Sequence, residues 1–170
     1  MNTIVDQTKK TVKKPFRKLG FTYLETAEIV VSLNDLMANY FIHYNKLRNF
    51  HWNVDGQEFF ELHKEFENEY NTVKENIDII AERIRVFGLK PSITIKETLA
   101  MSEIKEVDSA KMSPIEMVTE VLKDYGILHD KMLNVINASL ETGDNVTEQI
   151  VTDFMRGIEK RNWMFTSWCK

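Results

Sequence analysis

Apolar residues recur every three or four positions along the first part of the chain, which is the spacing of one face of an α-helix. The pattern begins after Thr22, which forms a capping box with Glu25, a typical start signal of a helix. It stops where Asp55-Gly56 interrupts it. The predicted helix carries on one face Ile29, Leu33, Leu36, Met37, Tyr40, Tyr44, Leu47, His51 and Val54.

The next segment has the most regular helical pattern in the sequence. We expect Asp55 to cap this second helix, with Glu58 in the capping-box position, and Gly88 to end it. Its apolar face consists of Phe59, Leu62, Phe66, Tyr70, Val73, Ile77, Ile80, Ile84 and Phe87.

Two further helices are predicted in the second half of the chain. The third has the strongest start signal, with Ser113 as cap, Pro114 at the first helical position and Glu116 completing the box. It continues to Gly143 through Ile115, Val118, Leu122, Tyr125, Met132, Ile136 and Leu140. The fourth helix runs from about Asn145 to Trp168, with Ile150, Phe154, Ile158, Met164 and Trp168 on its apolar side.

The lengths of the connections predict the topology. Short turns at Asp55-Gly56 and at Gly143 make each pair of flanking helices antiparallel. The connection of residues 88–112 is long enough to cross a whole bundle, and its apolar cluster predicts a small extra helix: Ile93, Ile95, Leu99, Met101 and Ile104. We therefore predict an all-α fold for residues 21–170, a ferritin-like four-helix bundle whose long crossover carries a short extra helix between helices two and three.

Length and composition are those of one globular domain. The chain has 170 residues, 43% of them apolar, and few glycines and prolines, so long regular elements should dominate. No apolar run approaches the ~20 residues of a membrane span, and none follows the first lysines as in a signal peptide. The single cysteine, Cys169, excludes an internal disulfide. We expect a cytoplasmic protein.

The charge is distributed unevenly between the N-terminus and the remainder. Residues 1–20 hold a net charge of +5, because Asp6 is outnumbered by Lys9, Lys10, Lys13, Lys14, Arg17 and Lys18. The whole chain carries −4, which leaves −9 for the remainder. A basic, flexible arm on an acidic body is typical of a tail that binds nucleic acid or a neighbouring acidic subunit. A solvated, disordered terminus explains the same residues equally well.

The second helix bears a polar stripe beside its apolar one. Its members are three or four positions apart and share a face: His63, Glu67, Tyr70, Lys74, Asp78 and Glu82. Imidazole mixed with carboxylate suits cations such as Fe(II), Zn(II) or Mn(II). His51 lies five residues before Gly56 and His63 seven after it, so a hairpin would bring the two rings to similar heights. The alternative is that both histidines are hydrogen-bonded core residues and the acids a solvated face.

The rise of the helix separates the two halves of this candidate site. Fifteen residues at ~1.5 Å each place Asp78 ~22 Å from His63, so one metal ion cannot touch both in one chain. A two-fold axis that packs two second helices antiparallel would bring the histidines of one chain to the acids of its partner. A di-iron centre inside the bundle would need Glu-x-x-His motifs. None exists, because the positions three before the four histidines hold Tyr40, Arg48, Phe60 and Gly126. We expect His43 and His129 to be partly buried or surface histidines rather than metal ligands.

Four stretches of the sequence resemble one known family. HWNVDGQEFFELHKEFENEY, which ends at Tyr70, and DIIAERI, which begins at Asp78, resemble the motifs of the Dps proteins. These are mini-ferritins that protect DNA during starvation. LKPSITIKETLAMSEIKE is similar to the family's inter-helix segment, and IEKRNWMFTSW to its last helix. The resemblance covers most of the chain.

The resemblance implies a hollow shell of twelve subunits with ferroxidase sites at its two-fold dimers. His51 and His63 would come from one subunit, and Asp78 and Glu82 from its partner. The implied activity is oxidation of Fe(II), preferentially by hydrogen peroxide, with ferric mineral stored inside the shell. Iron would occupy the site, and zinc or other divalent ions could substitute for it.

The resemblance also implies roles for two residues beside these ligands, Glu67 and Trp52. Glu67 stands where the family usually has an aspartate, so it would be a longer ligand or an outer-shell group. Trp52 resembles the family's site-adjacent tryptophan, to which a redox role is ascribed.

The resemblance carries over less directly to the pores and to DNA. Members often place acids early in the fourth helix, where they line three-fold pores. Here Asp144 and Glu148 are acidic, but Asn145 and Gln149 are amides, and acids favoured by the helix dipole explain the pair equally well. Only some members bind DNA. In this chain DNA binding, and with it a location at the nucleoid, would rest on the basic arm.

Two alternatives to the iron-oxidising shell follow from these residues. One is a DNA-compacting structural shell whose ferroxidase site is weak or unused. The other is a plain helical bundle that holds no metal.

Overall fold

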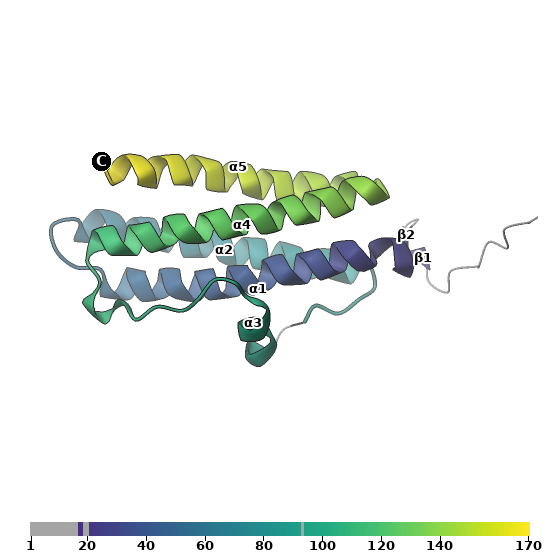
Figure 1. Ribbon diagram of the computed structural model, residues 1–170, viewed down its shortest axis with the longest axis horizontal. Helices are drawn as coiled ribbons and strands as arrows, with labels where there is room; N and C mark the ends of the chain where they lie inside the picture. The colour runs from purple at the N-terminus through teal and green to yellow at the C-terminus, as the bar shows by residue number, and fades with distance from the viewer. Residues whose placement is uncertain (1–16, 19–20, 93) are drawn as a thin grey trace, which may run out of the picture.

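Four long helices lie side by side along the length of the molecule in the computed structural model, which describes residues 17–18, 21–92 and 94–170 (Figure 1). They are α1 (Tyr23–Asn53), α2 (Phe59–Val86), α4 (Pro114–Thr142) and α5 (Asn145–Trp168). The crossover between α2 and α4 runs back along the bundle and contains α3 (Ile95–Met101) and a 3-10 turn, η1 (Ser109–Lys111). The predicted ferritin-like bundle with one long crossover is confirmed.

A short hairpin precedes the first helix. Strand β1 (Arg17–Lys18) pairs antiparallel with β2 (Phe21–Thr22), so that Arg17 faces Thr22. Helix α1 therefore begins one residue after the predicted start at Thr22. The rest of the predicted basic arm, residues 1–16 and 19–20, lies outside the described residues.

The start of α2 differs from the prediction. Asp55 does not cap this helix, because Gly56 follows with φ +94°, in the left-handed region that a helix cannot use. The chain continues as a turn, and the helix begins only at Phe59, with Glu58 at the cap position and no side-chain cap hydrogen bond. A cap residue must be followed directly by helical residues, so the glycine beside Asp55 prevents the predicted capping.

The signals around α4 and α5 act as predicted. The backbone N–H of Ser113 donates to Glu116 Oε2 (2.7 Å), one half of the capping box, and Pro114 is the first helical residue. Gly143 ends α4 in the left-handed conformation, φ +72°. Helix α5 has the bounds expected from the sequence, Asn145 to Trp168.

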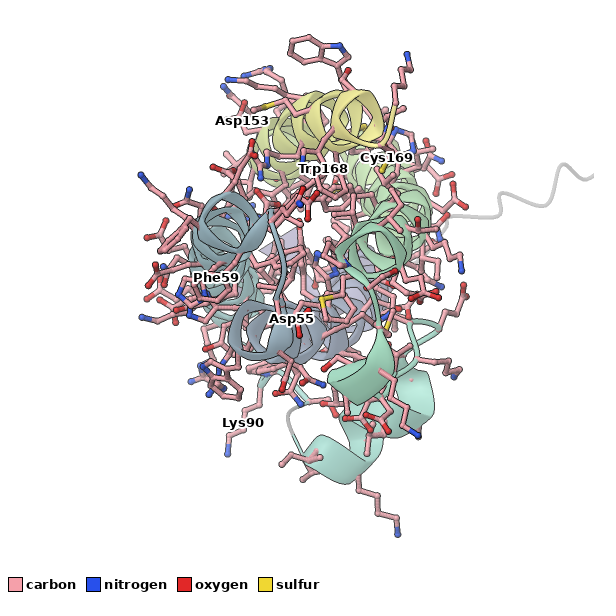
Figure 2. All side chains as sticks on the ribbon, turned by 90° about the vertical axis from the view of Figure 1, so that its left-hand side faces the viewer. Asp55, Phe59, Lys90, Asp153, Trp168 and Cys169 are labelled. Carbon is pink, nitrogen blue, oxygen red and sulfur yellow. The ribbon has the colours of Figure 1, made fainter. Side chains whose placement is uncertain are left out.

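Most of the predicted apolar positions meet in the interior of the bundle, but Ile115, Leu140 and Met164 are exposed (44%, 60% and 41%), so their assignment to the buried faces was wrong. Viewed end-on, the four long helices surround side chains that fill the interior, and the crossover with α3 lies outside them (Figure 2). The largest fully buried side chains include Tyr40, Phe50, Phe66 and Phe87. The apolar cluster of the crossover is only partly buried, because Ile104 is enclosed but Ile95 of α3 is 79% exposed. Among the described residues, none of the helices combines the length and apolarity needed to cross a membrane.

An ion pair joins the last turns of α2 to the start of α5. Asp144 is 1% exposed, and its carboxylate accepts hydrogen bonds from Arg83 Nη2 (2.6 Å) and from the backbone N–H of Thr147 (3.2 Å). Burial alone would raise the pKa of Asp144, but the hydrogen bonds from Arg83 and Thr147 outweigh it and hold this pKa below its ordinary value of 3.8.

We expect Asp144→Asn to lower the free energy of unfolding at neutral pH and to have little effect in acid. Asparagine keeps the cap but loses the charge. A carboxyl whose pKa is lowered by folding stabilises the protein above its unfolded pKa, near 3.8, and this stabilisation disappears as the pH falls through the folded value. Urea unfolding between pH 7 and 3 measures the difference. A gap between the two proteins that stays constant with pH would contradict the expectation, and the exposed Asp153→Asn serves as control.

Candidate metal centre

His51 and His63 face each other across the α1–α2 hairpin. Nδ1 of His51 lies 2.7 Å from the carbonyl oxygen of His63, and Nδ1 of His63 lies 2.7 Å from the carbonyl oxygen of His51. The two rings stack with centroids 3.8 Å apart and planes inclined by 22°. The hairpin therefore brings together the two histidines that the spacing about Gly56 predicts as neighbours.

This reciprocal pairing determines which ring nitrogen is free. A carbonyl oxygen can only accept a hydrogen bond, so each Nδ1 must carry the hydrogen. In a neutral imidazole the other nitrogen, Nε2, then has an available lone pair. Metal-binding histidines are commonly oriented in this way, with one ring nitrogen hydrogen-bonded and the other on the metal.

Aromatic neighbours hold the two rings in place. Phe59 stacks on His63 at 5.0 Å between centroids, and Tyr70 contacts His51 edge-on at 5.4 Å. His51 is 8% exposed and His63 is half-buried. The pair thus combines rigid rings with partial access from solvent.

Glu67 lies one helical turn beyond His63 on α2 and is exposed. Its Oε1 accepts a hydrogen bond from the hydroxyl of Tyr70 at 3.4 Å. Burial and then the charge of Glu67 raise the pKa of Tyr70, so the phenol stays protonated and donates to the carboxylate. A carboxylate is therefore available one turn from the histidines.

Asp78 and Glu82 lie farther along α2, and the structure does not bring them to the histidines of their own chain. Both are exposed, and neither has a hydrogen bond or ion pair with another described residue. Over the described ranges, no three or more His, Cys, Asp or Glu side chains are grouped so as to hold a metal ion. The described chain thus presents two imidazoles at one place and two carboxylates farther along the helix, about 22 Å (Asp78) and about 28 Å (Glu82) from His63.

Trp52 is 64% exposed beside the histidine pair. The guanidinium of Arg48 lies over its ring, 4.7 Å from the centroid, and also over the ring of Tyr44 at 5.3 Å. A cation over an indole ring stabilises its electron density. Removing an electron from Trp52 is therefore harder than from an isolated indole, and its redox role stays a prediction.

The predicted pore acids have different surroundings. Asp144 is buried as the cap of α5 and paired with Arg83, which matches the alternative that it is an ordinary helix-start acid. Glu148 is half-buried and accepts a hydrogen bond from Thr152 (3.2 Å), and its pore role stays a prediction. Of the basic arm, Lys9, Lys10, Lys13 and Lys14 lie outside the described residues, and Arg17 and Lys18 form β1.

Sequence reasoning missed a charged cluster inside the bundle. The cluster consists of two groups. In the first, Asp124 contacts His43 and Lys46, and in the second, Glu69 contacts Tyr125 and Arg161. A signal for it exists in the sequence, because Glu69 and Asp124 stand in the register of the apolar faces of their helices, three or four positions from buried residues such as Phe66 and Val121. Acids at core positions are rarely buried unless they are paired.

Comparison with known proteins places this geometry among ferritin-like proteins. The family model described as "Ferritin-like domain" matches residues 31–170. The DNA protection during starvation protein of Porphyromonas gingivalis is 34% identical over 92% of this chain and 98% of its own length, and General stress protein 20U of Bacillus subtilis is 33% identical over 83% and 97%. The crystal structure of the Dps protein from Vibrio cholerae O1, which is described as ferritin-like and diiron-carboxylate, superposes with a TM-score of 0.86 at 31% identity, over 91% of this chain and 96% of that one.

Proposed function

This chain belongs to the Dps family of ferritin-like proteins, and we propose that it oxidises Fe(II), preferentially with hydrogen peroxide, and stores the ferric product inside a cytoplasmic shell of twelve subunits. Two Fe(II) ions supply the two electrons that, with two protons, convert one hydrogen peroxide to two water molecules. Iron and peroxide together generate hydroxyl radicals, so removing both would protect DNA.

The observation that carries the proposal is the reciprocal pairing of His51 and His63. Their Nδ1–H groups are held by backbone carbonyls at 2.7 Å, which leaves both Nε2 lone pairs available in fixed positions. Imidazole nitrogen binds Fe(II) well, and zinc shares this preference.

The carboxylates would come from a second subunit. Asp78 and Glu82 are exposed and unpaired within the described chain, which is expected of metal ligands whose site is completed by a second subunit. An antiparallel pair of α2 helices about a two-fold axis brings them to the histidines of the other chain. Anionic oxygen donors stabilise Fe(III) more than Fe(II), because the interaction grows with the charge of the ion. The partner's acids would therefore favour oxidation, and Glu67 would assist as a longer ligand or as an outer-shell group.

Peroxide-driven oxidation of Fe(II), followed by size analysis of the loaded particle, tests activity and assembly together. We expect about two Fe(II) consumed per peroxide, slower oxidation with oxygen alone, inhibition by Zn(II), and a particle near twelve times 20.0 kDa that carries the iron. A monomer at working concentration, or iron that precipitates outside the protein at the uncatalysed rate, would overturn the proposal.

A second candidate function, direct binding and compaction of DNA, is favoured by the charge of the N-terminus. Residues 1–20 carry +5 and the remainder −9, so phosphate would be attracted only by the arm. Many arms on one shell would convert a weak contact into a strong one through avidity.

Lys→Gln changes at Lys9, Lys10, Lys13 and Lys14 should abolish the retardation of DNA in gels at physiological salt and flatten the dependence of binding on salt. The slope of log K against log salt is negative, and each lost phosphate contact reduces its magnitude by about 0.9. The matched control changes four exposed lysines of the body, Lys64, Lys90, Lys96 and Lys111. Equal loss of binding in both variants would show that the arm has no special role.

A further inference from the structure

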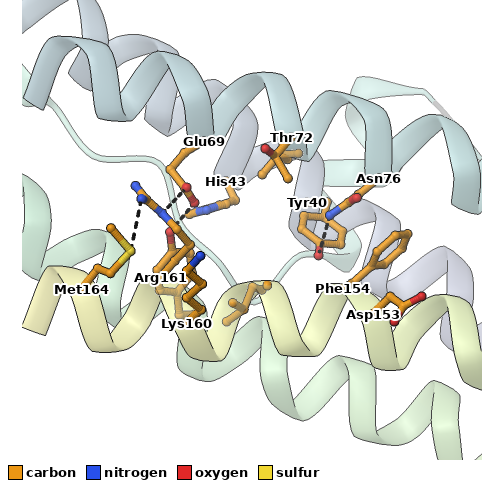
Figure 3. Close-up of a pocket in the computed structure, with 14 residues that line it drawn as sticks. Tyr40, His43, Glu69, Thr72, Asn76, Asp153, Phe154, Lys160, Arg161 and Met164 are labelled. Atoms are coloured by element: carbon orange, nitrogen blue, oxygen red, sulfur yellow. Dashed lines mark hydrogen bonds and ion pairs between the residues drawn. The ribbon is translucent and has the colours of Figure 1, made fainter.

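A cavity of about 410 Å³ lies between α2 and α5 and reaches the buried faces of α1 and α4. Figure 3 shows His43, Glu69 and Arg161 gathered in one part of it, and Tyr40, Asn76 and Phe154 in the other. The cavity is separate from the histidine pair of the candidate metal centre, since neither His51 nor His63 lines it. Its volume falls within the range of ~300–1,000 Å³ that is usual for small-molecule sites.

The cavity contains a hydrogen-bond acceptor without a partner. His43 is 0% exposed, and its Nδ1 lies 2.9 Å from Asp124 Oδ2. The ionised carboxylate accepts, so Nδ1 carries the hydrogen, and in the neutral imidazole Nε2 then holds a lone pair. Nε2 is buried and has no hydrogen-bond partner among the described residues. A buried acceptor left unpaired is destabilising, so a molecule that donates to Nε2 would be favoured.

The charged groups on the inner side of the cavity already balance one another, while the other charged residues of its lining, Asp153 and Lys160, are exposed. Asp124 pairs with Lys46 at 2.8 Å. Glu69 pairs with Arg161 and accepts a hydrogen bond from Tyr125. A charged ligand would disturb this balance in a poorly solvated site, which is costly. The ligand is therefore neutral.

Apart from Asp153 and Lys160, which are exposed, the remaining walls are uncharged and largely apolar. Burial raises the pKa values of Tyr40 and Tyr125, so both hydroxyls stay protonated. Val73, Phe154 and Ile158 line the cavity and can contact an apolar body. We propose that this cavity binds a small neutral molecule of the phenol class, whose apolar ring lies against these side chains and whose hydroxyl donates to Nε2 of His43.

Calorimetric titration of the assembled protein with phenol and with benzene tests the hydrogen bond. We expect phenol to bind roughly three- to tenfold more tightly than benzene, the ratio that corresponds to one neutral hydrogen bond. In His43→Phe the preference for phenol should disappear while benzene binding remains. Equal affinities for both probes in the unaltered protein, or no binding of either at millimolar concentration because the cavity holds only water, would overturn the proposal.

A second pair of variants tests the location without altering the buried charges. Gly157 lines the cavity on α5, and a Cβ added there would meet no atom within 4 Å, so Gly157→Leu can fold and extend into the opening. A Cβ added at Gly126 on α4 would also meet no atom within 4 Å, but Gly126 does not line the cavity. Gly157→Leu should weaken phenol binding by at least about tenfold, because it fills the site. Gly126→Leu should not change it, and equal affinities in the two variants would overturn the assignment.

Discussion

Replacing His51 and His63 together with alanine should lower the rate of peroxide-driven Fe(II) oxidation by more than about 100-fold. Loss of a residue that only supports a metal ligand already costs about 10–100-fold, so loss of both proposed imidazole ligands should exceed that range. The fold should survive, since His51 lies in the last turn of α1, at the end of the bundle, and His63 is only half-buried. The initial rate at which the ferric product forms is the measurement.

The matched control is His129→Ala. His129 is partly exposed on α4, and its Nε2 lies 3.7 Å from Glu159, on the surface and away from the hairpin. Its replacement should leave the oxidation rate unchanged. An unchanged rate in the His51/His63 double variant, with the assembly intact, would show that these residues are not the iron ligands.

Asp124→Ala should lower the free energy of unfolding by about 3–5 kcal/mol, the usual effect of removing one partner of a buried ion pair. Asp124 is buried between Lys46 (2.8 Å) and His43 (2.9 Å). Its removal leaves the ammonium of Lys46 buried, and among the described residues the remaining ion-pair partner of Lys46 is Glu120, at 3.6 Å. Urea unfolding at neutral pH measures the change.

Two comparisons separate this effect from a general loss of packing. Lys123→Ala breaks only an exposed pair with Glu120 and should have no measurable effect. The double variant Lys46→Met/Asp124→Leu should recover most of the lost stability, because it leaves no unpaired charge of this pair in the core. A loss below about 1 kcal/mol in Asp124→Ala would contradict the view that this pair supports the interior.

The arrangement of helices follows from local signals that can be read in the sequence. Period, caps and glycines predict α4 and α5 almost to the residue, because Ser113, Glu116 and Gly143 interact with their own helix. The start of α2 could not be predicted so well. Asp55 has the chemistry of a cap, but the backbone conformation at Gly56 delays the helix to Phe59, and this depends on how the whole hairpin closes.

The candidate site, like the start of α2, could be predicted only in part, because it depends on how the helices pack as well as on local signals. The heights of His51 and His63 follow from their distances to Gly56, but the reciprocal hydrogen bonds to each other's carbonyls depend on how α1 packs against α2. In the cluster around His43, the hydrogen bond between His43 and Asp124 joins residues 81 positions apart, on different helices. No periodic pattern within one helix predicts which of them meet.

The central claim, that one iron site is shared by two chains, can be tested by mixing two inactive variants. One variant carries His51→Ala and His63→Ala, the other Asp78→Ala and Glu82→Ala. In a dimer of one chain of each kind, one of the two sites receives unaltered histidines from one chain and unaltered acids from the other. With random pairing about half of the dimers are mixed, so about one quarter of all sites should be complete.

The measurement is the rate of Fe(II) oxidation by peroxide in shells in which the two variants are co-expressed, compared with each variant alone. We expect each variant alone to be inactive and the mixed shells to recover about one quarter of the unaltered rate. Mixed shells that form but remain inactive would contradict a site shared between chains.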